Sequence, residues 1–264
     1  MNEQELCKKR LLDLSRQAER KYMITFSHFL NLNEQNIYHS AEREFATKTL
    51  AFGGYHEAER QMVAFIPDAL MLWDKTREDS LREALCACDF PIRCLLAGPR
   101  HPKYAQQLTH RDVLGALMHL GIERGKLGDI ICMEHAYYIF CEEDIHAFIM
   151  DSLTQIRHTD VVLSVVEHTD FSAVSPEFEE RADVIASNRI DCIIARAYHL
   201  SRSEAADYLG SERVFIDGRC ITNCNQTCAG GAIVSVRGKG RFVFETEQAL
   251  SKKGKLKVVF RLYR

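Results

Sequence analysis

Basic and hydroxyl side chains gather in the last third of the chain, where their types and spacing could bind phosphate groups. Ser201 and Glu204 form a capping box, in which the serine caps free backbone amides and the glutamate reaches back to it. Arg202 lies in the first turn of the helix that follows. A helix N-terminus offers unpaired N–H groups and a partial positive charge, so it binds phosphate readily. Anion binding is therefore the chemistry indicated here, although an ordinary capped helix would show the same pattern.

The residues around this capping box predict two helices and an antiparallel sheet. A first helix from about 188 to 199 carries Arg189 and Arg196 two turns apart on one face. The second helix runs to Leu209, and Gly210 suits its left-handed end. Alternating apolar residues then predict strands, with the Asp-Gly dipeptide at 217–218 as a tight turn between the first two. The expected strands cover residues 213–216, 219–221, 231–237, 241–244 and 255–262.

Three motifs in this region carry a resemblance to a known family. They are L-S-R-S-E-A at 200–205, V-F-I-D-G-R at 214–219 and V-R-G-K-G-R-F at 236–242. Their order resembles the S-four domain, an RNA-binding module named after a ribosomal protein, and the last motif resembles its YlmH-type branch. Arg202 and the glycine-flanked Lys239 are expected at the centre of the RNA site. The full set of predicted RNA-binding residues is Arg189, Arg196, Ser201, Arg202, Ser203, Arg213, Arg219, Arg237, Lys239 and Arg241.

The charge of the chain is divided unevenly along its length. The net charge of the 264 residues is only −3, but residues 181–264 hold 15 Lys and Arg against 8 Asp and Glu. Residues 1–180 hold 19 against 29. A basic last third on an acidic body indicates one surface for a polyanion. The N-terminus has no apolar signal core and no stretch is long enough for a membrane span, so we expect a cytoplasmic protein with reduced thiols and no membrane partner.

The sequence predicts an α+β protein of three small domains. Residues 1–77 form an N-terminal α+β domain, with helices at 3–22 and near 34–46 and paired strands at 49–52 and 62–66. Residues 78–170 have the order β-α-β-β-α-β, which is the ferredoxin-like arrangement shared by RRM-like domains. A linker at 171–180 precedes the S-four-like domain at 181–264. The glycine-rich segment 53–60 is read as a tight connection in preference to a phosphate-gripping turn.

The middle domain has its own motifs. The stretch His110–Leu117, with the glycines at 121 and 128, resembles the YlmH-type middle domain, which the resemblance implies helps to bind RNA. Arg111 and Arg124 are the candidates for that contact. Tyr137 and Tyr138 are adjacent and would point to opposite faces of a strand, so at most one could stack on a base.

Two enzymatic functions and one non-enzymatic function compete with RNA binding. A methyltransferase would need a glycine-rich cofactor loop after a strand, and the Gly-Lys-Gly at 238–240 lies between two strands instead. A pseudouridine synthase would need a catalytic Asp near an Arg, and Arg189-Ile190-Asp191 copies this only locally, where a structural role is favoured. Cys220, Cys224 and Cys228 lack a paired C-x-x-C arm, so packing is favoured over a metal site. The third alternative is a protein-interaction module that uses the acidic body.

We therefore expect non-catalytic binding of structured rRNA or tRNA at the ribosome, with no cofactor, metal, catalytic residue or small-molecule substrate. The physical basis is neutralisation of phosphates by Arg and Lys, together with recognition of A-form shape. The resemblance to YlmH-type proteins further implies the large ribosomal subunit with peptidyl-tRNA, in ribosome rescue or quality control.

Overall fold

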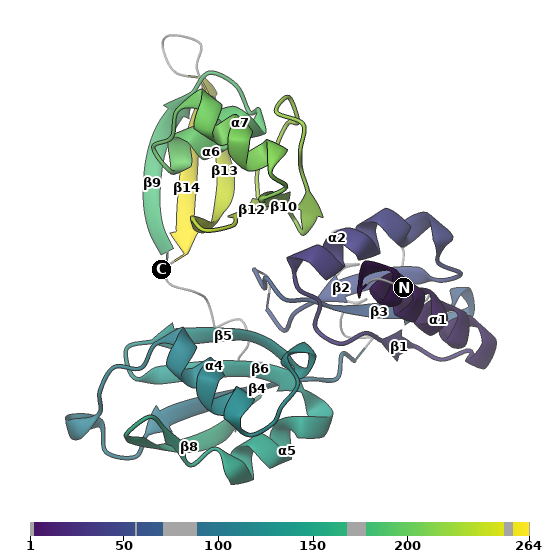
Figure 1. Cartoon of the computed structure of the whole chain (residues 1–264), viewed down its shortest axis with the longest axis vertical. Helices are drawn as coiled ribbons and strands as arrows, with labels where there is room; N and C mark the ends of the chain where they lie inside the picture. Colours follow the sequence, from purple (N-terminus) through teal and green to yellow (C-terminus); the bar gives the residue numbers. More distant parts are fainter. Residues whose placement is uncertain (1–2, 56, 71–88, 168–177, 251–255, 264) are drawn as a thin grey trace. The chain divides into compact units, whose positions relative to one another are not determined.

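The protein is α+β, as predicted, and divides into two compact units. The computed structural model describes residues 3–55, 57–70, 89–167, 178–250 and 256–263 (Figure 1). The units are Met1–Ser175 and Pro176–Arg264. The first unit contains two sheets and the second contains one, and every strand pair within the described sheets is antiparallel. None of the described helices is long and apolar enough to cross a membrane.

The N-terminal part of the first unit packs two helices against a small sheet. Leu11 and Ala18 of the first helix share a core with Val63 and Phe65 of the central strand. The predicted helices and strand pair are confirmed, but the second helix ends earlier than expected and a short 3-10 turn follows it. The elements are α1 (Glu3–Lys21), β1 (Thr25–Phe26), α2 (Leu32–Ala41), η1 (Glu42–Glu44), β2 (Lys48–Phe52) and β3 (Met62–Ile66), with sheet order β1-β3-β2.

The middle part has the predicted β-α-β-β-α-β order. Thr109 and Asp112 form a capping box at the start of α4, and Gly121 ends the same helix with a φ of 79°. The sequence predicts a helix over residues 142–156, and helix α5 (Glu143–Ser152) is present but ends earlier. The chain turns at Arg157 (φ 54°), and β7 (Gln155–Ile156) pairs back on β8 (Thr159–Val166). The elements are β4 (Ile92–Pro99), α4 (His110–His119), β5 (Leu127–Met133), β6 (Ala136–Glu142), α5 (Glu143–Ser152), β7 (Gln155–Ile156) and β8 (Thr159–Val166), with sheet order β5-β6-β4-β8-β7.

The two faces of the middle sheet are covered differently. Helices α4 and α5 cover one face, where Val113, Leu117 and Ile149 pack on the strands (Figure 1). On the other face, Phe140 packs against Tyr55 of the N-terminal part, with ring centroids 5.1 Å apart. The core of this second face therefore belongs to both parts of the first unit.

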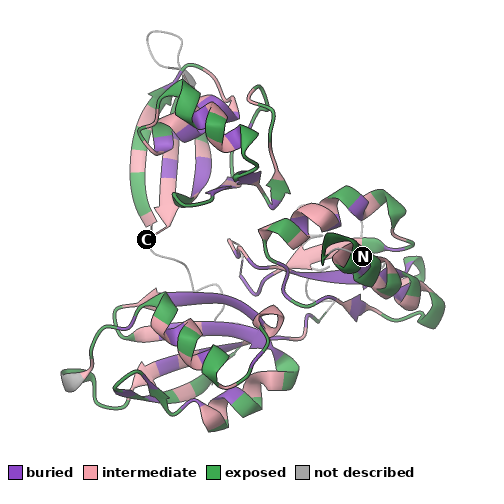
Figure 2. Cartoon of the chain, in the orientation of Figure 1, coloured by how far each residue is buried: buried purple, intermediate pink, exposed green. Residues whose placement is uncertain are grey.

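The C-terminal unit packs two helices on one face of a six-stranded sheet (Figure 1). Ile190 and Ile194 of α6 and Leu209 of α7 share a core with Val234 and Phe242 of the sheet. Figure 2 shows buried stretches on both the helices and the strands of this unit. The elements are β9 (Phe178–Ile185), α6 (Ile190–Ala197), α7 (Arg202–Gly210), β10 (Val214–Ile216), β11 (Arg219–Cys220), β12 (Ala232–Val236), β13 (Gly240–Leu250) and β14 (Leu256–Tyr263). Their order in the sheet is β11-β10-β12-β13-β14-β9.

Three expectations for this unit need correction. Strand β9 begins at Phe178, inside the segment 171–180 expected as a linker, and it pairs with β14 over eight residues. Only Ile185 of β9 is buried, so the strand lacks the apolar alternation that predicts strands. Strand β13 runs to Leu250, well beyond the expected end at 244. The left-handed residue after α7 is Glu212 (φ 56°), whereas Gly210 is the last residue of the helix itself.

Candidate nucleic-acid interface

The predicted capping box at the start of α7 is confirmed. Ser201 Oγ accepts from the N–H of Glu204 at 3.2 Å, and the N–H of Ser201 donates to Oε2 of Glu204 at 2.8 Å. Ser203 Oγ lies 3.1 Å from Ser201 Oγ. All of these side chains are exposed. The helix start therefore faces solvent, with a hydroxyl pair and Arg202 beside it.

Asp191 holds two of the predicted RNA-binding arginines. Its Oδ2 accepts from Nη2 of Arg189 at 2.8 Å and from Nη2 of Arg202 at 2.7 Å, which links the starts of α6 and α7. The Asp191 side chain is only 6% exposed, whereas that of Arg202 is 58% exposed. Burial alone would raise the pKa of Asp191, but the hydrogen bonds from both arginines outweigh it and lower that pKa. Asp191 therefore has the structural role that the sequence favoured, because it holds Arg189 and Arg202 together at the starts of α6 and α7.

Arg196 lies away from this pair. It shares α6 with Asp191 but makes a two-point ion pair with Asp183 of β9, in which Nε lies 2.6 Å from Oδ2 and Nη2 lies 2.7 Å from Oδ1. This geometry fixes the helix to the edge strand. Arg196 and Arg189 were expected on one face of the helix, but they pair with different carboxylates, Asp183 and Asp191.

The turn between β12 and β13 brings Lys239 near the start of α7. The N–H of Lys239 donates to the carbonyl of Val236 at 2.9 Å, and Gly238 and Gly240 on either side have φ values of 82° and 112°. Hydrogen bonds from Ser201 lower the pKa of Glu204, and the charge of Lys239 adds to that effect. Lys239 is therefore close enough to the capping box to act on it electrostatically. We call Arg189, Ser201, Arg202, Ser203 and Lys239 the helix-start surface.

Arg237 and Arg241 point to the other side of the sheet. Val236 and Phe242 pack under the helices, and neighbouring residues of a strand face opposite ways. The guanidinium of Arg237 lies 5.0 Å from the ring centre of Phe215, and that of Arg241 lies 3.9 Å from the ring centre of Tyr263. These arginines flank Lys239 in sequence but form a second basic surface, which does not face the capping box.

The remaining two candidates lie around the β10–β11 hairpin. The predicted tight turn is present, with φ values of 47° at Asp217 and 78° at Gly218, and it leaves Arg219 exposed at the start of β11. Arg213 stacks on Tyr208, 4.6 Å from the ring centre, and donates to the carbonyl of Arg237 at 2.7 Å. Arg213 therefore orders the backbone next to the β12–β13 turn.

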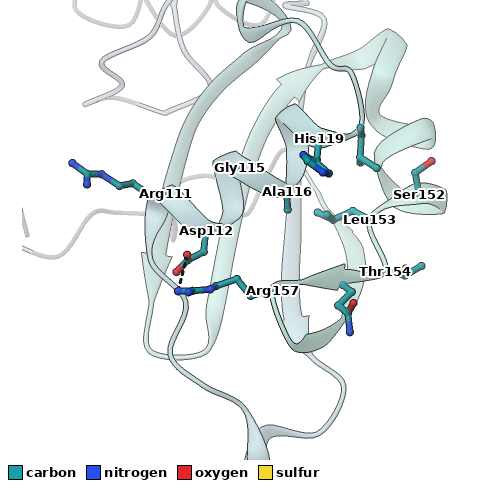
Figure 3. Close-up of a pocket in the computed structure, with 11 residues that line it drawn as sticks. Arg111, Asp112, Gly115, Ala116, His119, Ser152, Leu153, Thr154 and Arg157 are labelled. Carbon is teal, nitrogen blue, oxygen red and sulfur yellow. Dashed lines mark hydrogen bonds and ion pairs between the residues drawn. The ribbon is translucent and has the colours of Figure 1, made fainter.

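The two candidates of the middle domain have different environments. Arg124 donates to the carbonyls of Leu127 at 2.7 Å and Gly128 at 3.2 Å, and burial lowers its pKa to about 10. Its guanidinium is thus occupied by its own loop. Arg111 is exposed in the first turn of α4, beside a groove that also contains Arg157 (Figure 3). Arg157 was not among the predicted RNA-binding residues, because the β7–β8 hairpin that brings it to α4 was not expected.

The cysteines of the C-terminal unit show the chemistry of packed thiols. Burial raises the pKa of Cys228 to about 12 and raises that of Cys220 as well. Cys224 and Cys228 pack on the core of the unit. Across the residues that the structure describes, no group of three or more His, Cys, Asp or Glu side chains is arranged to hold a metal ion.

The fold and these surfaces define an α+β protein with a split β-α-β middle domain and a separate basic unit. Two family models match the chain, "YlmH, N-terminal" over residues 3–70 and "Putative RNA-binding domain in YlmH" over residues 89–170. Together they span more than half of the chain, which therefore belongs to the YlmH family. The YlmH-type resemblance predicted for the middle domain is confirmed. The matches end at residue 170, so the S-four resemblance of the last unit stays a prediction.

Two individual proteins are similar to this chain. It is 29% identical over 250 residues to the "Ribosome-associated protein quality control protein P2" of Bacillus subtilis (strain 168), in an alignment that covers 94% of this chain and 91% of that protein. Among solved structures, it is similar to the "Cell division protein ylmH from Streptococcus pneumoniae", with 19% identity and a TM-score of 0.47. That comparison covers 64% of this chain and 94% of the solved one.

Proposed function

We propose that this protein binds structured rRNA or tRNA at the ribosome and catalyses no reaction on it. The observation that carries this function is the helix-start surface, where Arg202 and Lys239 lie exposed around the uncovered start of α7. Unpaired amides, hydroxyls and cations at one place suit the phosphates of a folded RNA. In this proposal the C-terminal unit is S-four-like, and its two helices packed on an antiparallel sheet support that assignment.

Membership of the YlmH family and the name of the Bacillus subtilis relative support the ribosome as the setting. In this proposal the target of the cytoplasmic protein is the large subunit carrying peptidyl-tRNA, in quality control, which is what the resemblance to YlmH-type proteins implies. The non-enzymatic assignment is supported by the position of Asp191. Its carboxylate is buried and engaged by Arg189 and Arg202, so it is not presented to a substrate base.

The test is sedimentation of the full-length protein with purified large subunits over a series of salt concentrations. Each neutralised phosphate releases counterions, so the logarithm of the affinity should fall linearly with the logarithm of the salt concentration. Large subunits bearing peptidyl-tRNA should retain more protein than empty subunits at the same salt. Binding that ignores salt, or a protein-dependent methyl group or pseudouridine found in the rRNA by mass spectrometry, would overturn the proposal.

A further inference from the structure

The face of the middle sheet that is not covered by α4 and α5 is closed over much of its area. RRM-like domains stack bases on such a face. Here, Tyr55 lies on Phe140, and Gly54 fits so closely that a Cβ on it would lie 2.5 Å from the Phe140 ring. Phe29 and Phe90 pack in the same core. The part of this face that the N-terminal part covers is therefore not available for stacking bases.

Exposed cations gather at one end of the same domain. The N–H of Arg100, just after β4, donates to the carbonyl of Asp160 in β8, so the β4–α4 segment lies against the β7–β8 hairpin. Arg157 of that hairpin reaches α4 and lies 3.1 Å from Asp112. The exposed basic residues of these segments are Arg100, His101, Lys103, His110, Arg111, Arg157 and His158. Asp112 and Asp160 are the acidic groups among them, so positive charge predominates.

A groove of about 480 Å³ opens beside this end, between α4 and the segment that follows α5. Its volume falls within the usual range for small-ligand sites, about 300–1,000 Å³. Figure 3 shows Arg157 directed toward Asp112 and Arg111 projecting outward from the same end of α4. Gly115 and Ala116 line the groove, together with Leu153 and Thr154 from the other wall. The groove thus has basic side chains at its rim and small or apolar residues along its floor.

Gly115 has no packing reason to be glycine. It lies inside α4, where glycine is less favourable than alanine, and a Cβ built on it would meet no atom within 4 Å. The absent side chain therefore opens space on the groove side of the helix. A flat group could lie over Gly115 and Ala116 while an attached phosphate reaches the arginines at the rim. A guanidinium has five N–H donors. Arg157 donates to Asp112 through Nη1, so its other N–H groups can serve such a phosphate.

We propose that this groove holds one unpaired nucleotide of the bound RNA, with its phosphate at Arg111 and Arg157 and its base over Gly115 and Ala116. This proposal rests on the proposed function and adds a second point of contact, in a different unit from the helix-start surface. A bulged or looped nucleotide fits best, since the base must leave its stack to enter the groove.

The test compares two labelled RNA stem-loops that differ only in a single-uridine bulge. The full-length protein should bind the bulged RNA severalfold more tightly than the fully paired RNA. Gly115→Leu adds a bulky side chain at a position where a Cβ meets no atom within 4 Å, and it should remove this preference while leaving affinity for the paired RNA unchanged. Gly115→Ala is the matched control, which should keep the preference. Arg111→Gln should reduce the salt slope by about one unit for the bulged RNA alone.

The following outcomes decide whether the groove is a nucleotide site. Equal affinity of the parent for both RNAs, or a preference that survives Gly115→Leu, overturns the groove as a nucleotide site while salt-dependent ribosome binding still supports the proposed function. Loss of all RNA and ribosome binding by the parent would refute the proposed function itself. Uridine monophosphate should weaken binding of the bulged RNA and not of the paired RNA, and a preference for the bulge that saturating nucleotide leaves unchanged would overturn the groove as its site.

Discussion

The hydroxyl of Tyr55 donates a 2.6 Å hydrogen bond to Oδ2 of Asp129, and this contact joins the β2–β3 connection to the middle sheet. The same carboxylate accepts from the N–H of Glu59 at 2.7 Å and, through Oδ1, from the N–H of Arg60 at 3.1 Å. Both partners of the tyrosine contact are buried. Tyr55, Glu59 and Arg60 of the β2–β3 connection therefore dock the N-terminal part onto the middle domain.

Replacing Asp129 should weaken this docking strongly. Asp129→Ala leaves the Tyr55 hydroxyl and two backbone N–H groups without their acceptor, so the free energy of unfolding should fall by about 2–4 kcal/mol. Urea denaturation followed by far-UV circular dichroism measures it. Asp151→Ala on the exposed side of α5 is the control and should change stability by no more than about 0.5 kcal/mol. A comparable effect of the two substitutions would contradict the role of Asp129.

A second docking contact should make stability depend on pH. Nδ1 of His28 lies 2.5 Å from Oε1 of Glu142, and this hydrogen bond raises the pKa of His28 above 6.5, against burial, which lowers it. The protonated ring stabilises the folded unit, so its contribution is full below the unfolded pKa and is lost as the pH rises through the raised one. The stability advantage of the parent over His28→Gln should therefore be largest at about pH 6 and shrink as the solution becomes alkaline.

Glu142→Gln should remove the same pH dependence, because it takes away the charge that holds the proton on His28. Adding His28→Gln to it should change the pH profile no further. The test is to measure the free energy of unfolding from about pH 6 to alkaline pH for the parent, both single variants and the double variant. A difference between the parent and His28→Gln that stays constant with pH would show that the contact is a neutral hydrogen bond.

Local chemistry explains which elements could be predicted from the sequence. The capping box at Ser201 and Glu204 and the Asp-Gly turn at 217–218 each specify their backbone within a few residues, and the structure has both. Strand β9 escaped prediction because its side chains are mostly polar, and pairing with β14 defines it instead. The early end of α5 likewise depends on β7 pairing with β8. Such long-range or hairpin contacts leave little trace in periodicity.

The candidate site shows the same division. The sequence predicted which basic residues are candidates, but it did not predict which of them lie on the same surface. Arg237 and Lys239 are two residues apart in the sequence but lie on different surfaces. Arg237 stacks on Phe215, whereas Lys239 lies in the β12–β13 turn near the start of α7. Arg124 was a reasonable cation to select, yet its loop turns it onto backbone carbonyls. One wall of the groove at Gly115 lies within the motif at His110–Leu117, but the opposite wall comes from residues 152–157, and no sequence pattern indicated that the two segments meet.

Asp191 should control the stability of the helix-start surface. Asp191→Asn keeps the shape of the side chain but removes the charge that both arginines bind, so unfolding free energy at neutral pH should fall by about 1–3 kcal/mol. Because the folded pKa is lowered below the usual 3.8, the contribution is complete above that value and is lost as the pH falls through the lowered pKa. Thermal unfolding of parent and variant from neutral to acidic pH should therefore converge at the acidic end. A gap that persists into strong acid would mean that packing, not charge, accounts for the effect.

The helix-start surface should dominate RNA affinity. Arg202→Ala and Lys239→Ala should each weaken binding to large subunits severalfold and reduce the salt slope by about one unit, because each removes one phosphate contact. Lys239 is exposed in a turn, so its loss should alter stability by no more than about 0.5 kcal/mol. Arg202 also forms an ion pair with Asp191, so Arg202→Ala should lower the free energy of unfolding somewhat more, by up to about 1 kcal/mol.

Two controls separate this surface from general electrostatics. Lys48→Ala, on a strand edge of the acidic N-terminal part, should leave both affinity and salt slope unchanged. Arg241→Ala removes a cation of equal charge from the opposite face of the C-terminal sheet, where it stacks on Tyr263. If RNA occupies the helix-start surface alone, Arg241→Ala should weaken binding much less than Arg202→Ala. Equal losses would mean that the RNA reaches both faces of the sheet, and normal binding by both Arg202→Ala and Lys239→Ala would place the site elsewhere.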